Sequence, residues 1–275
     1  MIDLGAAVRL IASCTDAGGV PANADSVTLT LTLPDGTTTS PAVTNPPTVV
    51  GQYSVDYTAT QPGRHTVHWQ FAGPAAAYAD VFDVRPTDPG FLFSLADAKK
   101  HLNVAAGSTG DDDEIRDWSA ATTWIVEHFV GPVARRSVTE RHSFTTADTR
   151  VLRHTPAIAL TSVVPVLAGG HSYDPADLDL DPDTGIVQRL DGGVLYGPLR
   201  FNYTAGRAQV RANITGAGRI ILQHLWRTQR GSARGPVIAG GDDYAVSEPV
   251  AGIGYAIPNR ALELLEPDRL PPGLA

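Results

Sequence analysis

The sequence predicts a multidomain protein, with an all-β sandwich over residues 1–87 followed by an α+β domain over residues 91–275. The length of 275 residues suits two domains of ordinary size. Residues 1–87 alternate apolar and polar side chains with the period of a strand, whereas helical periodicity begins only after the turn-rich stretch 85–90. Hydrophobic residues make up 43% and charged residues 18% of the chain, which indicates packed cores rather than disorder.

Several short strands separated by turns are expected in the first domain. Val27, Leu29 and Leu31 alternate with threonines, as in a strand that buries one face. Turn residues occur at 34–36 (PDG) and 61–63 (QPG). The expected strands cover residues 8–12, 27–33, 53–57, 67–71 and 81–85. Short strands at this spacing, with no helical stretch, are typical of a small β-sandwich.

About three main helices are expected in the second domain. Ser94 is a suitable N-cap for a short helix over residues 95–102. The acidic run 112–114 favours the start of a longer helix, because negative charge is stabilised at a helix N-terminus. Gly131 and the proline after it end that helix. A third helix is predicted from about residue 213 to 230 by its apolar face.

A small sheet and a final helix complete the prediction for the second domain. Strands are expected at residues 137–145, 150–152, 186–190 and 199–203. The Gly-rich stretch 231–256 is expected to be a mobile loop. Residues 257–265 predict a short C-terminal helix, because a proline stands in its first turn.

The last strands of the first domain resemble those of bacterial and phage immunoglobulin-like domains. The likeness lies in residues 51–55 (GQYSV) and 62–69 (PGRHTVHW). Cys14 is the chain's one cysteine, so this would be a variant without the two-cysteine bridge of antibody domains. The fold alone fixes no function, because such domains serve many.

Residues 91–275 resemble the head–tail connector (adaptor) family of phages with long non-contractile tails. The first two matching segments are 94–102 (SLADAKKHL) and 112–115 (DDEI) with Trp118, Ala121 and Gly131. A further match is the passage from 203–206 (YTAG) to Leu225-Trp226. The ending, 257–265 (IPNRALELL) followed by 271–273 (PPG), is similar to connectors of phages that infect actinobacteria.

The resemblance implies a structural virion protein at the head–tail interface. It implies a homo-oligomeric, dodecameric ring under the portal protein, which extends the DNA channel and presents a platform to the next head–tail joining (stopper) or tail protein. The net charge of -8 is unlike the basic footprint of a nucleic-acid-binding protein, so DNA is expected to pass without sequence-specific binding. No apolar run approaches the length of a membrane span.

Two groups of residues are candidates for these roles. One of two acidic loops, 111–114 or 174–183, is expected to contribute to the channel wall, because an acidic surface does not retain DNA. The channel candidates of the first loop are Asp111, Asp112, Asp113 and Glu114. The tail 257–275 is expected to dock on the portal, with folding back onto its own domain as the alternative. The portal-docking candidates are Ile257, Pro258, Arg260, Leu262, Leu264, Leu265 and Arg269.

No catalytic constellation is apparent, and neither a cofactor nor a metal is expected. The run 111–114 is explained by a helix N-terminus. The run 177–185 lacks the Gly and Glu positions of a calcium loop and is explained by a strand entering a turn. The alternative functions are a virion-surface binding module acting through the immunoglobulin-like domain and, third, an enzyme with a metal at 177–183. Trp118, Trp124 and Trp226 are expected in the core or at a subunit interface.

Overall fold

The structure is a computed structural model that describes residues 1–74, 76–230 and 257–270. The chain divides into two compact units, Met1–Pro89 and Gly90–Ala275. This division falls inside the turn-rich stretch 85–90. The expected loop over 231–256 and the end of the tail, 271–275, lie outside the described residues. In the described part of the chain, no helix combines the length and the apolarity needed to cross a bilayer.

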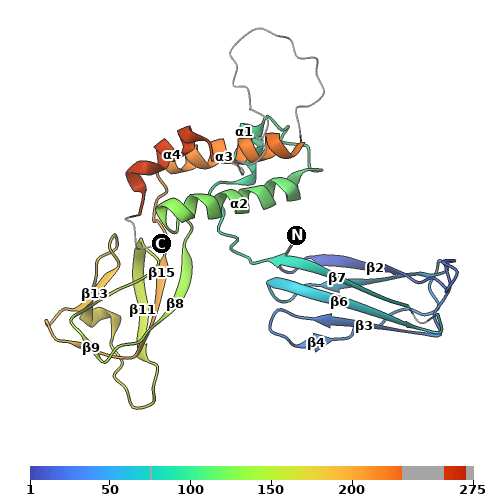
Figure 1. Ribbon diagram of the computed structural model, residues 1–275, viewed down its shortest axis with the longest axis horizontal. Helices are drawn as coiled ribbons and strands as arrows, with labels where there is room; N and C mark the ends of the chain where they lie inside the picture. Colours follow the sequence, from blue (N-terminus) through green and yellow to red (C-terminus); the bar gives the residue numbers. More distant parts are fainter. Residues whose placement is uncertain (75, 231–256, 271–275) are drawn as a thin grey trace, which may run out of the picture. The chain divides into compact units, whose positions relative to one another are not determined.

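The first unit is built from strands in two sheets (Figure 1). The strands are β1 (Ile2–Asp3), β2 (Ala7–Ser13), β3 (Ser26–Thr32), β4 (Thr38–Thr39), β5 (Gln52–Thr58), β6 (Gly63–Ala72) and β7 (Ala76–Arg85). One sheet has the order β1-β7-β6-β3-β4, and the other pairs β2 with β5. All pairs are antiparallel except β1 with β7.

Both sheets bury one face in a common core. Leu29 and Leu31 of β3 lie opposite Trp69 and Val67 of β6, and all four side chains are buried. Leu10 and Ala12 of β2 and Tyr53 of β5 belong to the same core cluster. The strand alternation in the sequence therefore gave the correct buried face, because side chains alternate between faces.

The described residues of the second unit form four α-helices, which are labelled in Figure 1. They are α1 (Leu95–Leu102), α2 (Asp112–Val130), α3 (Ala212–Arg230) and α4 (Asn259–Leu265). The Ser94 side chain accepts a hydrogen bond from the Asp97 amide, which confirms the predicted cap of α1. The four helices share one hydrophobic core, which includes Ile115, Ile214 and Leu222. Each of these side chains is fully buried.

The strands of the second unit form several sheets instead of the single small sheet expected. They are β8 (Arg136–His142), β9 (Thr146–Ala147), β10 (Thr149–Val151), β11 (Ala157–Pro165), β12 (Leu178–Leu180), β13 (Ile186–Arg189), β14 (Leu195–Tyr196) and β15 (Leu199–Ala205). The sheet orders are β11-β15-β8, β10-β13-β12 and β14-β9. A second core lies among these strands and includes Phe201, Tyr203 and Leu152.

Strand β11 was not predicted from the sequence. Its pairing with β15 shifts register between Ala157 and Ala159 and again between Leu160 and Ser162. Such irregularities break the alternation that predicts a strand. The strand also lies between two prolines, Pro156 before it and Pro165 at its end, which are signals for turns.

Gly131 connects the helical part of the second unit to its sheets. Its φ is +73°, and a Cβ atom added there would lie 2.1 Å from the carbonyl oxygen of Thr155. Only glycine fits this approach, because both the backbone angle and the space exclude a side chain. Helix α2 therefore ends against the start of β11.

Candidate functional site: a pocket between helix α2 and the sheets

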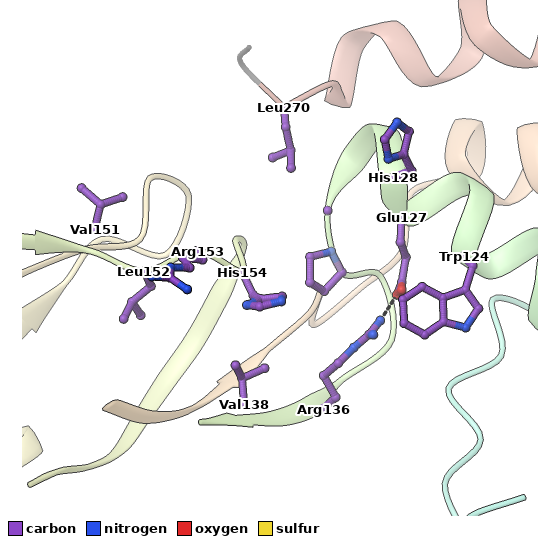
Figure 2. A pocket seen from close by; sticks show the side chains of 12 residues that line it. Trp124, Glu127, His128, Arg136, Val138, Val151, Leu152, Arg153, His154 and Leu270 are labelled. Carbon is purple, nitrogen blue, oxygen red and sulfur yellow. Dashed lines mark hydrogen bonds and ion pairs between the residues drawn. The ribbon is translucent and has the colours of Figure 1, made fainter. Parts of the chain in front are cut away.

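A large pocket lies where α2 meets the strands of the second unit (Figure 2). Its volume is about 840 Å³. Helix α2, strand β8, the segment after β10 and the residues after α4 all contribute to it. The lining residues are Trp124, Glu127, His128, Gly131, Pro132, Arg136, Val138, Val151, Leu152, Arg153, His154 and Leu270. The pocket is therefore assembled from parts of the chain that are distant in sequence.

One wall of the pocket is formed by an aromatic side chain and an ion pair. Trp124 projects from α2 and is 69% exposed, which is unusual for so large an apolar side chain. The guanidinium of Arg136 lies 5.7 Å from the centre of the Trp124 ring and forms an ion pair with Glu127 (Figure 2). Glu127 also accepts hydrogen bonds from the amides of Val133, at 2.9 Å, and Ala134. These contacts hold Arg136 in one place and neutralise its charge.

Behind the pocket lies a buried carboxylate, Glu140, whose side chain is 4% exposed. It accepts hydrogen bonds from His142 Nε2 at 2.9 Å and from His154 Nδ1 at 2.7 Å. The hydroxyl of Tyr203 donates a short hydrogen bond to it, and the amide of Arg153 donates another at 3.1 Å. The partners come from β8, β15 and the segment after β10, so Glu140 joins these parts of the second unit.

The environment of Glu140 fixes the protonation of the network. Burial raises the pKa of this carboxyl, but hydrogen bonds from His142, His154 and Tyr203 outweigh burial and hold the pKa well below its ordinary value. Burial, together with the hydrogen bond to Glu140, raises the pKa of Tyr203. Glu140 is therefore an ionised acceptor and Tyr203 a protonated donor at neutral pH.

This arrangement suits binding better than proton transfer. The oxygens of Glu140 are occupied by donors, and Nδ1 of His154 is one of those donors. The groups left at the pocket surface are apolar side chains, His128, the imidazole edge of His154 and the side chain of Arg153. Within the described residues, no group of three His, Cys, Asp or Glu side chains is placed to hold a metal ion. The pocket can therefore take an apolar group accompanied by negative charge.

The predicted acidic residues 111–114 lie at the start of α2. Asp112 forms an ion pair with the buried Lys99, and Asp113 lies 3.9 Å from Arg116. Of the four, only Asp113 is exposed. The other three, Asp111, Asp112 and Glu114, are partly buried. The predicted helix N-terminus is confirmed by the start of α2 at Asp112. Their place in a channel wall stays a prediction.

The aspartates of the run 177–185 belong to a strand and a turn. Asp179 on β12 accepts a hydrogen bond from Gln188 at 3.0 Å. Asp181 accepts hydrogen bonds from the Thr184 hydroxyl and the Asp183 amide, and these bonds lower its pKa. Asp181 therefore stabilises its own turn, as Asp does in many tight turns.

The position of residues 257–270 differs from the one expected from the sequence. Helix α4 packs on the helical core, where Ala261 and Leu265 are fully buried and Ile257 and Leu264 are partly buried. The expectation of a tail that reaches outward is wrong for residues 257–270, and the alternative, folding back onto the domain, is what the structure has. In this conformation Leu265 is not accessible to a portal.

Polar contacts after α4 hold the same segment in place. Asp268 is 3% exposed and accepts hydrogen bonds from Arg211 and Asn213, both at 2.9 Å. The amide of Leu270 donates to the carbonyl of Phe129 at 2.9 Å. Of the other portal-docking candidates, Arg260 and Arg269 are exposed, and Pro258 and Leu262 are partly exposed. Contact of these four with a portal stays a prediction.

Sequence reasoning missed the residues that build the pocket. Trp124 was expected in the core or at an interface, and its exposure excludes the core. A signal was present, because Trp124 lies off the helical face of Ile115, Trp118 and Ile125. The spacing of Glu140 and His142 was also a signal, since residues two apart on a strand share one face. Neither signal reveals the partners from β15 or from the segment after β10.

Comparisons with known proteins add no family. The sequence matched no profile of a known protein family, and it had no significant match among curated proteins. The connector resemblance of residues 91–275 therefore stays a prediction based on the quoted segments.

Proposed function

We propose that this chain is a structural subunit of a bacteriophage neck, a head–tail connector that forms a dodecameric ring between the portal and a tail-joining protein. The observation that carries this proposal is the packing of the second unit. The segments 94–102, 112–131 and 257–265, distant in sequence, supply helices α1, α2 and α4 to one core. Strand β15 ends in the predicted YTAG segment and precedes α3, which completes that core.

The character of the exposed surface supports an assembly role. The pocket exposes a tryptophan and is mostly lined by apolar groups, as expected of a surface that contacts another protein. Its buried carboxylate is engaged on all sides by hydrogen-bond donors. Such a network stabilises a fold, whereas a general acid or base must exchange its proton. These features favour a structural protein over an enzyme.

We also propose that the first unit is an immunoglobulin-like sandwich. Strands β2 and β5 correspond to strands B and E of that fold, and the order β7-β6-β3-β4 corresponds to G-F-C-C′. The parallel pairing of β1 with β7 adds a first strand beside the last. Cys14 is buried and free, so the core replaces the bridge of antibody domains with apolar side chains.

The charge of the chain agrees with a DNA channel. The chain has a net charge of -8, so a ring of many copies would repel DNA phosphates. The exposed carboxylate of Asp113 is the best candidate of the first acidic loop for the channel wall. Passage of DNA without binding requires such a surface, because clustered Lys and Arg would retain it.

A second candidate function is binding at the virion surface through the first unit. Ile11, Tyr78 and Val81 are exposed on strands β2 and β7, around a groove of about 130 Å³. Exposed apolar side chains around a groove are suited to contact a partner. A first unit that binds host cells or glycans while the whole chain stays monomeric on portal-containing heads would favour this function.

Electron microscopy of purified virion necks tests the connector proposal. We expect a ring of this chain coaxial with the portal, in contact with it on one side and with a tail-joining protein on the other. The free protein can be monomeric before the portal templates the ring, so the virion or a portal complex is the proper sample. A neck that lacks this chain would end the proposal.

A further inference from the structure

We propose that the pocket between α2 and the sheets receives the acidic tip of a neighbouring copy of this chain, with Leu190 as the inserted side chain. The tip is defined as residues 189–193, which begin at the last residue of β13, together with Asp174 and Asp177. This inference rests on the proposed ring and names the contact that closes it.

The pocket provides an apolar site that the described residues of its own chain do not fill. Trp124 is 69% exposed and Val151 is 42% exposed, and both face a space of about 840 Å³. Burying apolar surface on this scale is favourable, at about 25 cal/mol for each Å² removed from water. Rings use contacts between two different patches of the same chain, so a pocket on one copy calls for a projection elsewhere on that copy.

The exposed charge at the pocket rim is positive. Glu127 and Arg136 neutralise each other, and Glu140 is buried beneath the surface. The side chain of Arg153 is exposed at the rim, and the exposed His128 also lines the pocket. An apolar side chain accompanied by carboxylates is therefore the complementary occupant.

The tip has this complementary character. Leu190 is 65% exposed, the most of any large apolar side chain described in the second unit after Trp124. Its amide donates to the carbonyl of Asp177 at 3.0 Å, which places Leu190 beside that residue. Asp174, Asp177 and Asp191 are exposed around it, and Arg189 pairs with Asp191. Three carboxylates and one guanidinium leave the tip negative.

Another exposed leucine of the second unit lacks this setting. Leu167 is 60% exposed, but the residues that follow it are Ala168, Gly169, Gly170 and His171. It matches Leu190 in size and exposure without adjacent carboxylates, so it is a control for apolar exposure alone.

If the tip occupies the pocket of a neighbour, Asp113 and the loop around it remain the candidates for the channel wall.

A charge exchange tests the contact in rings assembled on portal-containing heads. Neither Arg153 nor Asp177 supports the fold with its side chain in any contact described above, so Arg153→Glu and Asp177→Arg should fold normally. Each single substitution should lower ring assembly by at least about tenfold, because it places like charges in one contact. The double variant should restore assembly, whereas Arg153→Glu with Leu167→Arg should not, because the new cation then lies outside the contact.

Engineered cysteines test the same contact directly. Cys14 is buried, so new cysteines at Val151 and Leu190 would be the accessible thiols. Val151 pairs with Ile186. Leu190 lies four positions further along the chain from Ile186, about 13 Å away in extended backbone, which is too far for a disulfide within one chain. Oxidised rings of Val151→Cys/Leu190→Cys should give a ladder of covalent oligomers. Rings of Val151→Cys/Leu167→Cys should remain single chains.

The possible outcomes distinguish failure of the proposed pocket contact from failure of the proposed connector function. The inference is supported if the unmodified chain forms rings and one of two further results is found. Either the double charge variant restores assembly, or covalent oligomers form with a cysteine at position 190 and not with one at position 167. Rings that form equally well with either single charge reversal and give no ladder overturn the inference and leave the connector function standing. If the unmodified chain forms no ring on portal-containing heads, the connector function fails and the inference fails with it.

Discussion

Replacing Glu140 with alanine should destabilise the second unit severely. The substitution leaves the hydroxyl of Tyr203, the amide of Arg153 and the His142 ring without their acceptor in a buried site. Each buried polar group left without a partner costs about 1–3 kcal/mol. Some of these groups can reach water through the pocket, so we expect a loss of about 3–5 kcal/mol in the free energy of unfolding. For a domain of this size, that lowers the Tm by roughly 10 °C.

The assay is thermal unfolding of the whole chain, detected by calorimetry so that the transitions of the two units are resolved. The transition of the first unit should not move and serves as an internal control. Tyr203→Phe keeps the ring but removes one donor to Glu140 and the acceptor of the His154 amide, so it should cost about 1–3 kcal/mol, less than Glu140→Ala. A Glu140→Ala protein whose second unit unfolds within about 1 kcal/mol of the unmodified protein would refute the role given to this network.

The same network predicts a direction of pH dependence. The pKa of Glu140 is depressed in the folded protein, below its ordinary value of 4.5. The stabilisation it provides is therefore complete above that pH and is lost as the pH falls toward the folded pKa. In Glu140→Gln the side chain does not titrate, so the second unit should lose less stability than the unmodified protein between pH 5 and the acid limit of folding. Equal losses in the two proteins would contradict the depressed pKa.

Three further predictions concern the fold. Gly131→Ala should cost at least about 2 kcal/mol, because φ is +73° and the carbonyl of Thr155 occupies the space; chemical denaturation measures this, and an unchanged midpoint would exclude the close approach. Leu265→Ala should cost about 2–5 kcal/mol, because the side chain is fully buried, whereas a docking segment would tolerate the change without loss of stability. Residues 1–89 expressed alone should give a β-type circular dichroism spectrum and a cooperative melt, because this unit has its own core; an unfolded fragment would show that it depends on the rest of the chain.

The helices and most strands could be predicted because their signals are local. The Ser94 cap, the acidic start at Asp112 and the closing Gly131 each act within one turn of the helix they bound. The Glu140 network could not be predicted, because its acceptor and the Tyr203 hydroxyl are separated by 63 positions. Only the pairing of β8 with β15 brings them together, and pairing partners are not encoded in a local pattern.

The tail shows why an apolar segment alone does not decide between docking and folding back. Leu262, Leu264 and Leu265 predicted a hidden apolar face but not what covers it. The structure covers it with the core of the same domain, and the deciding contacts are polar. Asp268 is bound by Arg211 and Asn213, which lie at the start of α3. Such long-range pairs give no periodic signal in the sequence.

The side chains and backbone around the pocket are held in place by fixed contacts, and this bears on what the pocket can bind. Arg136 is held by Glu127, the backbone of Arg153 and the ring of His154 are held by Glu140, and Gly131 fixes α2 against Thr155. A partner that enters a pocket of this kind orders few side chains, so less of the binding free energy is lost to conformational entropy. The proposed ring would multiply that gain, because every copy would both offer a pocket and fill one. A loosely held pocket would make a poor contact in the proposed ring. A pocket supported from beneath by an ionised, fully hydrogen-bonded carboxylate would keep its shape before a neighbouring copy binds.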